Sequence, residues 1–285
     1  MKIALAIQCH ANSKQINRLI EFFHDEDIDI YIHVDKKSNI INEIEINNNV
    51  KIVKDSVDVR WGQISQVEAT LKLFNLINSS ERSYDYVHLI SGEDYPVKSL
   101  QEFKDFFKEN KNEYIQYGFL PTKILSRNGI DRYSVYYPKW MIDRPCKILK
   151  RTIRVVYREF ILRTHLFKRK FDLEDYICYG SSWFSITGAC MKYILIYLKE
   201  HKKYYNFFKN SIYSDEMFFQ TIIVNSPFKN HIKNDNLRYI DWSEKQGSPK
   251  TLNIDDAKKA IFINTFFARK IVNMDVINFI EKSLN

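Results

Sequence analysis

The sequence predicts an α/β protein, with a mostly parallel sheet and helices on both of its faces. Strand-like and helix-like segments alternate over residues 1–120, and this alternation is typical of such a sheet. The strand-like segments are short apolar runs rich in β-branched and aromatic residues, whereas the helix-like segments repeat apolar residues every three or four positions. The predicted strands cover residues 2–8, 28–34, 51–53, 84–90, 183–186 and 237–242, and the predicted helices cover residues 13–24, 65–77, 100–107, 146–164, 190–199 and 276–284.

The first strand, helix and strand lie within about 35 residues, as in nucleotide-binding βαβ units. The apolar run of the first strand stops after Ile7 and no small-residue cleavage site follows, so we interpret it as a strand rather than a signal peptide. The glycine fingerprint of dinucleotide sites is absent, which argues against such a cofactor. Asp35 ends the second strand, where it could accept hydrogen bonds from a ribose or uracil, or serve only as a turn residue.

The segment 84–107 joins a buried strand to an amphipathic helix through a polar turn. The turn, Ser91-Gly92-Glu93-Asp94, follows the strand directly, and Ser99 with Glu102 forms a predicted capping box for the helix. Ligands of α/β sheets bind at the carboxyl ends of strands, which makes Glu93 and Asp94 candidate site residues. The alternative is that these two acids only stabilise the turn.

The segment 139–171 is dense in lysine and arginine and contains a predicted amphipathic helix at 146–164. Leu149, Ile153, Val156 and Phe160 repeat at helical spacing, and a basic stripe, Lys147, Arg151, Arg154 and Arg158, repeats two residues earlier. One interpretation packs the apolar face on the core and leaves the cationic face in water. The other places the helix on an anionic membrane surface.

In the last third of the chain, Ser214-Asp215-Glu216 is predicted to open a helix that carries Met217 and Phe218. Capping of that helix alone would explain its two acids. We found no repeat, low-complexity segment or linker rich in proline or glycine, so residues 1–285 are interpreted as one domain. Its parts are a nucleotide-binding half at 1–120, the basic segment at 139–171, and a catalytic and acceptor half at 176–285.

Composition narrows the classes of function further. The net charge of +8 calls for an anionic partner such as a nucleotide, nucleic acid or membrane surface. A non-catalytic protein that binds nucleic acid or an anionic membrane is the alternative to an enzyme, but no nucleic-acid motif is present. No apolar run approaches the roughly 20 residues of a membrane span. Cys9, Cys146, Cys178 and Cys190 lack paired spacing, which is typical of reduced thiols in a cytosolic protein.

Eight stretches, in chain order, resemble the core-2/I-branching glucosaminyltransferase and peptide xylosyltransferase family, glycosyltransferase family 14. They are CHANSKQINRLI, YIHVDKKS, RWGQISQVEATLKLF, YVHLISGEDYPVKS, YGSSWFSIT, SDEMFFQT, YIDWSEKQGSPKTL and FFARK. The resemblance implies a GT-A-type fold and inverting transfer of GlcNAc, xylose or a related sugar from a UDP-sugar to a glycan acceptor. The chain departs from the animal enzymes in that it lacks their membrane-anchored stem and their paired cysteines. The expected family member is bacterial, with a role in surface polysaccharide synthesis. Its 120–175 region has no clear family counterpart and is expected to shape the acceptor side.

The resemblance also implies roles for individual residues. Glu216 matches the catalytic base, and its predicted place at a helix N-terminus should keep it ionised and lower its basicity. The nucleotide-sugar would be bound by Asp35, His10, Lys250, Arg269 and Lys270. The acceptor or donor pocket would include Trp61, Glu93, Asp94, Tyr95, Trp183 and Trp242.

No metal ion and no other cofactor are expected. Glu93 and Asp94 are adjacent in sequence and should point apart, whereas the lysines and arginine of the last quarter can stabilise a leaving diphosphate. The expected partners are a UDP-sugar, a glycan or lipid-linked glycan acceptor, and an anionic membrane surface, with no nucleic acid. The expected location is cytoplasmic, peripheral on the inner membrane face.

Overall fold

The computed structural model describes residues 1–142, 148–244 and 247–284. Within these ranges the largest sheet has seven strands, in the order β10-β6-β9-β4-β1-β2-β3. The strands of this sheet are β1 (Ile3–Cys9), β2 (Ile28–Val34), β3 (Val50–Ile52), β4 (Tyr86–Ser91), β6 (Glu113–Tyr114), β9 (Phe184–Thr187) and β10 (Ile232–Lys233). Strands β4, β1, β2 and β3 run parallel, while β9 is antiparallel to both β4 and β6. The predicted α/β class with a mostly parallel sheet is confirmed.

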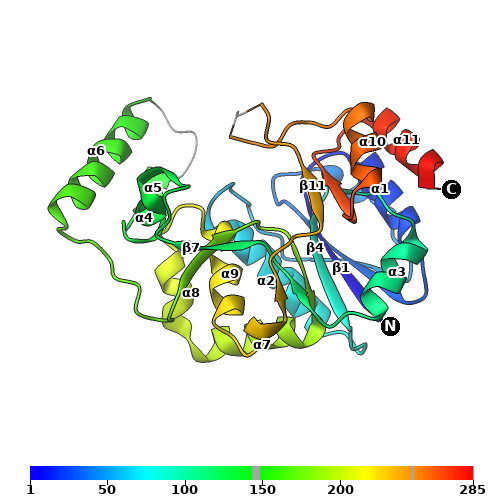
Figure 1. The fold of residues 1–285 in the computed structure, drawn as a ribbon, viewed down its shortest axis with the longest axis horizontal. Coiled ribbons are helices and arrows are strands. Elements are labelled where there is room, and N and C mark those ends of the chain that lie inside the picture. Colours follow the sequence, from blue (N-terminus) through cyan, green and yellow to red (C-terminus); the bar gives the residue numbers. More distant parts are fainter. Residues whose placement is uncertain (143–147, 245–246, 285) are drawn as a thin grey trace.

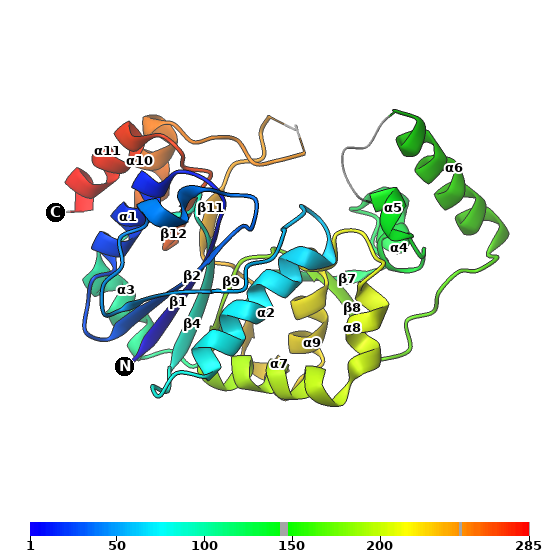
Figure 2. The same ribbon diagram turned by 180° about the vertical axis from the view of Figure 1, so that it is seen from behind.

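Helices cover both faces of this sheet (Figures 1 and 2). The cause is visible in β1, where Ile3, Leu5 and Ile7 enter one apolar core and Ala4 and Ala6 enter the other. The first core is closed by α1 (Ser13–Phe22), α3 (Leu100–Lys108), α10 (Ile254–Phe262) and α11 (Met274–Leu284). The second core is closed by α2 (Ile64–Asn78), α7 (Gly188–Glu200), α8 (Lys202–Phe208) and α9 (Phe218–Val224).

Two small sheets flank the central one. In the first, β11 (Arg238–Ile240) pairs with β12 (Phe267–Arg269), which pairs with β5 (Tyr95–Pro96). In the second, β7 (Tyr117–Leu120) is antiparallel to β8 (Ile177–Gly180), and Leu120 lies opposite Ile177. The whole segment between these two strands therefore leaves and re-enters the fold at one place.

That segment carries α4 (Ile130–Tyr133), α5 (Lys139–Ile142) and α6 (Ile148–Thr164), which lie at the opposite end of the molecule from α10 and α11 (Figure 1). A small apolar cluster of Val135, Tyr137, Ile142 and Ile161 connects them. The predicted 146–164 helix is present from Ile148 onward. Cys146 and Lys147 lie outside the described residues, and Cys9, Cys178 and Cys190 are buried free thiols.

The structure corrects the sequence analysis at Ser214. A short 3-10 turn, η3 (Ser214–Glu216), stands where a helix was predicted to open, and α9 begins only at Phe218. Tyr213 before the turn has a φ of 54°, a left-handed conformation that an α-helix cannot follow smoothly. Strands β6 and β10 were not predicted, because two-residue strands give no measurable period. Helix α10 was also missed, although its capping box, Asn253 with Asp256, was an available signal. The remaining 3-10 turns are η1 (Ile40–Glu43), η2 (Ser126–Gly129) and η4 (Lys229–His231).

None of the helices in the described part of the chain is both long and apolar enough to span a bilayer.

Candidate functional site

A cavity of about 1190 Å³ opens where the parallel strands β1, β2 and β4 end. Gln8 and His10 line it from the end of β1, Asp35 from the end of β2, and Ser91 and Glu93 from the end of β4. This is the edge at which α/β sheets bind ligands, because the loops that follow adjacent parallel strands diverge there. The cavity is large enough for a nucleotide joined to a sugar, and small-molecule sites typically measure about 300–1,000 Å³.

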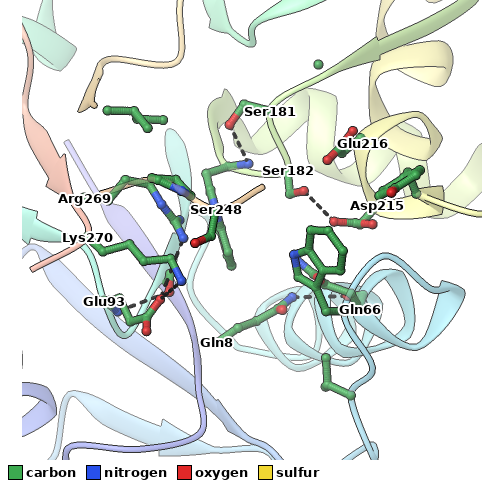
Figure 3. Close-up of a pocket in the computed structure, with 18 of the residues that line it drawn as sticks. Gln8, Gln66, Glu93, Ser181, Ser182, Asp215, Glu216, Ser248, Arg269 and Lys270 are labelled. Carbon is green, nitrogen blue, oxygen red and sulfur yellow. Dashed lines mark hydrogen bonds and ion pairs between the residues drawn. The ribbon is translucent and has the colours of Figure 1, made fainter. Parts of the chain in front are cut away.

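One wall of the cavity carries two cations, Arg269 and Lys270, at the end of β12 (Figure 3). Lys270 Nζ lies 3.1 Å from Glu93 Oε2, and the guanidinium of Arg269 lies 4.0 Å from the same oxygen. The Arg269 guanidinium also stacks over the Trp183 ring at 5.0 Å. Glu93 therefore holds both cations at the cavity wall, where the Arg269 side chain is buried and the Lys270 side chain is 26% exposed.

Asp94, the neighbour of Glu93, points instead into the core. Its Oδ2 lies 3.4 Å from Nε of Arg238 and its Oδ1 lies 3.0 Å from Nη1 of Arg269, with the Asp94 and Arg238 side chains fully buried. Arg238 also donates to the Leu89 carbonyl at 2.6 Å. Asp94 thus anchors Arg269 from behind, and we assign it a structural role in place of the pocket role expected from sequence.

The opposite wall carries Glu216 and Asp215, on the η3 turn (Figure 3). Glu216 Oε2 accepts a hydrogen bond from Arg132 Nη1 at 2.5 Å, and the Arg132 guanidinium lies 4.5 Å from the centre of the Tyr213 ring. Burial raises the pKa of Glu216 above its ordinary value, while Arg132 acts in the opposite direction. The expectation that a helix N-terminus lowers its basicity is wrong, because α9 starts two residues later.

Two contacts hold η3 and helix α9 against the turn between β8 and β9, which carries Trp183. Ser182 Oγ donates to Asp215 Oδ2 at 2.7 Å (Figure 3), and Gln220 Nε2, on α9, donates to the Ser181 carbonyl at 2.6 Å. Burial, together with the neighbouring Glu216, raises the pKa of Asp215. The other oxygen of Asp215 is buried without a hydrogen-bond partner among the described residues.

The Arg60-Trp61-Gly62 turn supports η3 from the other side. The Gly62 carbonyl accepts from Tyr213 N at 2.7 Å, and the Trp61 and Tyr213 rings meet edge to face at 5.7 Å. Gly62 has a φ of 70°, which residues with a Cβ rarely adopt, and a Cβ there would touch the Tyr213 ring at 3.4 Å. The WG pair thus locks Tyr213 in the left-handed conformation that presents Glu216 to the cavity.

The cavity brings together most of the residues proposed from sequence. His10, Asp35, Trp61, Glu93, Trp183, Glu216, Trp242, Arg269 and Lys270 all line it. Asp35 is nearly buried, and its Oδ1 accepts a hydrogen bond from the backbone N of Lys37 at 3.0 Å. Asp35 therefore also stabilises the turn after β2, the role that the alternative interpretation gave it.

Lys250 and Tyr95 do not line the cavity. Lys250 Nζ lies 2.8 Å from Asp256 Oδ2, away from the wall that its neighbours Ser248 and Pro249 form. Tyr95 is fully buried, and its hydroxyl donates to Glu281 Oε1 at 2.6 Å. Contact between Tyr95 and a ligand would require part of the core to open, so we assign it to the scaffold.

Sequence reasoning missed three residues of the site. Arg132 lies in the region without a family counterpart and shows no pattern that could have identified it. Asp215 and Ser182 were inside recognised stretches, SDE and GSSW, and the adjacency of Asp215 to Glu216 was an available signal. In the described part of the chain, no group of three or more histidine, cysteine, aspartate or glutamate residues could hold a metal ion.

Comparison with known proteins places this geometry in a family. The model of the Core-2/I-Branching enzyme matches residues 3–264. Xylosyltransferase 2 of Rattus norvegicus is 23% identical over 99% of this chain and 33% of its own length, and Xylosyltransferase 1 of the same species is 24% identical over 100% and 35%. This chain therefore spans about a third of the length of these relatives.

Two solved structures are similar at lower identity. The apo structure of the bifunctional glycosyltransferase WbbM has a TM-score of 0.43 and 13% identity, covering 98% of this chain and 49% of that one. The apo form of mouse xyloside xylosyltransferase 1 has a TM-score of 0.38 and 9% identity, covering 96% and 99%. The family match, which extends over almost the whole sequence, shows that the chain belongs to the Core-2/I-Branching enzyme family of glycosyltransferases.

Proposed function

We propose that the chain is an inverting glycosyltransferase of GT-A type that moves a sugar such as GlcNAc or xylose from a UDP-sugar to a glycan acceptor. The observation that carries this proposal is the arrangement of charge across the cavity. A carboxylate, Glu216, faces the space from one wall and two cations, Arg269 and Lys270, face it from the other (Figure 3). The nucleotide would lie at the ends of β1 and β2, beside His10 and Asp35.

An inverting transfer is a single in-line displacement. The attacking hydroxyl needs a negatively charged base beside it, and the leaving diphosphate needs positive charge beside it. Glu216 takes the proton of the acceptor hydroxyl while that oxygen forms its bond to the anomeric carbon. The bond from the anomeric carbon to the diphosphate oxygen breaks on the other side, and its electron pair leaves with UDP. Arg269 and Lys270 stabilise the charge that develops there, and Glu93 and Asp94 hold them in position.

We also propose that these two fixed cations take the place of a divalent metal ion. A guanidinium and an ammonium on a rigid strand can neutralise a diphosphate through charge-assisted hydrogen bonds. The biological setting that we propose is synthesis of a bacterial surface polysaccharide. Exposed aromatic rings at the cavity, Trp61 and Trp242, would contact the sugar rings of the acceptor.

The substitution Glu216→Gln tests the proposal. The amide keeps the shape of the side chain but cannot take a proton, so UDP release should fall by about 10²–10⁴-fold. Binding of UDP, measured as a thermal shift, should persist. The matched control is Glu21→Gln on the exposed face of α1, which should keep full activity. The donor is first identified by testing wild type against a panel of UDP-sugars. If UDP release then falls by less than about tenfold in Glu216→Gln, Glu216 is not the base.

A further inference from the structure

Helix α6 exposes the apolar face that one of the two interpretations of the sequence packs on the core. Of its residues only Ile161 is buried, whereas Leu149, Val156 and Phe160 are 70%, 63% and 50% exposed. Together with Ile153 these residues form what we call the outer stripe, and their spacing places them on one side of the helix. The exposed apolar surface continues past the end of the helix at Leu166 and Phe167.

The opposite side of α6 faces the body of the protein and carries the polar contacts. Tyr157 donates from its hydroxyl to the Tyr136 carbonyl at 2.8 Å. Arg158 lies 3.8 Å from Asp131 Oδ2, on α4, and 3.2 Å from Glu159. The contacts with Tyr136 and Asp131 fix the rotation of the helix. The interpretation that packs the apolar face on the core and leaves the cationic face in water is therefore wrong, and the membrane interpretation stays open. The outer stripe has no cover among the described residues.

A run of exposed apolar side chains on one side of a helix is typical of a binding surface. Charge indicates what it binds. Residues 139–171 contain eleven lysines and arginines but only two acids, and Arg151 and Arg163 are exposed near the two ends of α6. Glu159, the acid within the helix, already pairs with Arg127 at 2.8 Å. A second copy of the chain would place two such cationic segments against each other, which like-charge repulsion opposes.

We propose that the outer stripe docks on an anionic lipid bilayer. The apolar side chains enter the boundary between headgroups and acyl chains. Arg163, beside the stripe, and the exposed Arg151, near the amino-terminal end of α6, add positive charge close to the anionic headgroups. Helix α6 and Arg132, which lines the cavity, both lie on the segment between β7 and β8. Docking of α6 therefore holds the cavity close to the membrane surface. The proposal rests on the exposed surface alone and does not depend on the reaction in the cavity.

Sedimentation with lipid vesicles tests the docking. Wild type should bind vesicles of phosphatidylglycerol and phosphatidylcholine at low salt, bind phosphatidylcholine alone weakly, and lose affinity as salt rises. The double variant Leu149→Glu, Phe160→Glu should lose about tenfold or more in partitioning, because it puts charge where apolar side chains insert. Arg151→Glu with Arg163→Glu should lose the preference for the anionic lipid.

The matched control is Ile46→Glu with Phe262→Glu, which makes the same kind of change at exposed positions outside α6 (69% and 88% exposed). It should bind vesicles as wild type does, and circular dichroism should show all variants folded. Failure of wild type to bind anionic vesicles at low salt overturns the proposal, as does equal binding by the Leu149, Phe160 variant. A dimer in solution that this variant dissociates would show that the occupant is a second copy.

Discussion

Replacing Arg132 by glutamine should move the pH dependence of catalysis, because Arg132 is the charged partner of Glu216. The two side chains meet at 2.5 Å in a largely buried setting. An opposite charge within about 4–6 Å lowers the pKa of a carboxyl by about 1–3 units, so removing it should raise that of Glu216 by a similar amount. A base must be deprotonated to act, and the acid limb of the profile should therefore shift upward by about 1–3 units.

The assay is kcat/KM for UDP-sugar turnover against pH, which reports the ionisation of the free enzyme. Arg132→Lys keeps the positive charge and should leave the acid limb near that of wild type. Arg127→Gln removes a nearby arginine that pairs with Glu159 instead, and it should leave the limb in place. On the alkaline side of the limb Arg132→Gln should recover much of its activity, which a purely structural defect would not allow.

The reasoning is refuted if the limb of Arg132→Gln stays within about half a pKa unit of wild type while Glu216→Gln remains inactive. That result would mean that Arg132 does not set the ionisation of Glu216 in the free enzyme. A limb that moves downward would contradict the sign of the interaction. If Arg132→Gln and Arg132→Lys shift the acid limb by the same amount, the effect comes from the geometry of the side chain rather than from its charge.

Two other predictions concern the cation wall and the core behind it. Lys270→Ala should reduce turnover by about 10²–10³-fold, the typical cost of losing one group that stabilises developing charge, whereas excess EDTA should leave wild type active. Inactivation of wild type by EDTA and its recovery with manganese would make Glu93 a candidate metal ligand. Asp94→Ala should lower the free energy of unfolding by about 3–5 kcal/mol, since Arg238 would be left buried without its charge partner. The exposed Asp255→Ala is its control in urea titrations, and equal midpoints for the two variants would contradict this role.

The parallel strands of the amino-terminal half could be predicted from the sequence because the patterns that indicate them are local. The strands at the amino-terminal half are apolar runs that end in polar turns, and the parallel order places Asp35 and Glu93 at one edge of the sheet. The adjacent acids Glu93 and Asp94 could be expected to point apart, and one faces the cavity while the other enters the core. Each of these features depends on residues that are close together in the chain.

What the sequence could not predict depends on distant partners. The rotation of α6 is set by Asp131 and Tyr136, which lie outside the helix. The apolar periodicity within α6 therefore carries no information about them. The partner of Glu216 is 84 positions away in the chain and comes from a four-residue helix. The left-handed Tyr213 is held by the Gly62 carbonyl, a constraint that only the folded chain supplies.

The pairing of Leu120 with Ile177 makes the segment between them exchangeable. Its two ends meet across one strand pair, and the entropy of closing a loop rises only slowly with loop length. A shorter or longer segment could therefore be inserted there, in evolution or by engineering, without altering the order of the central sheet. The exchange would replace Arg132, which lies within the segment, but would keep Glu216, Arg269 and Lys270, which lie outside it. A single exchange would then change the proposed acceptor surface, the proposed membrane contact and the pKa of the proposed base, Glu216, at the same time.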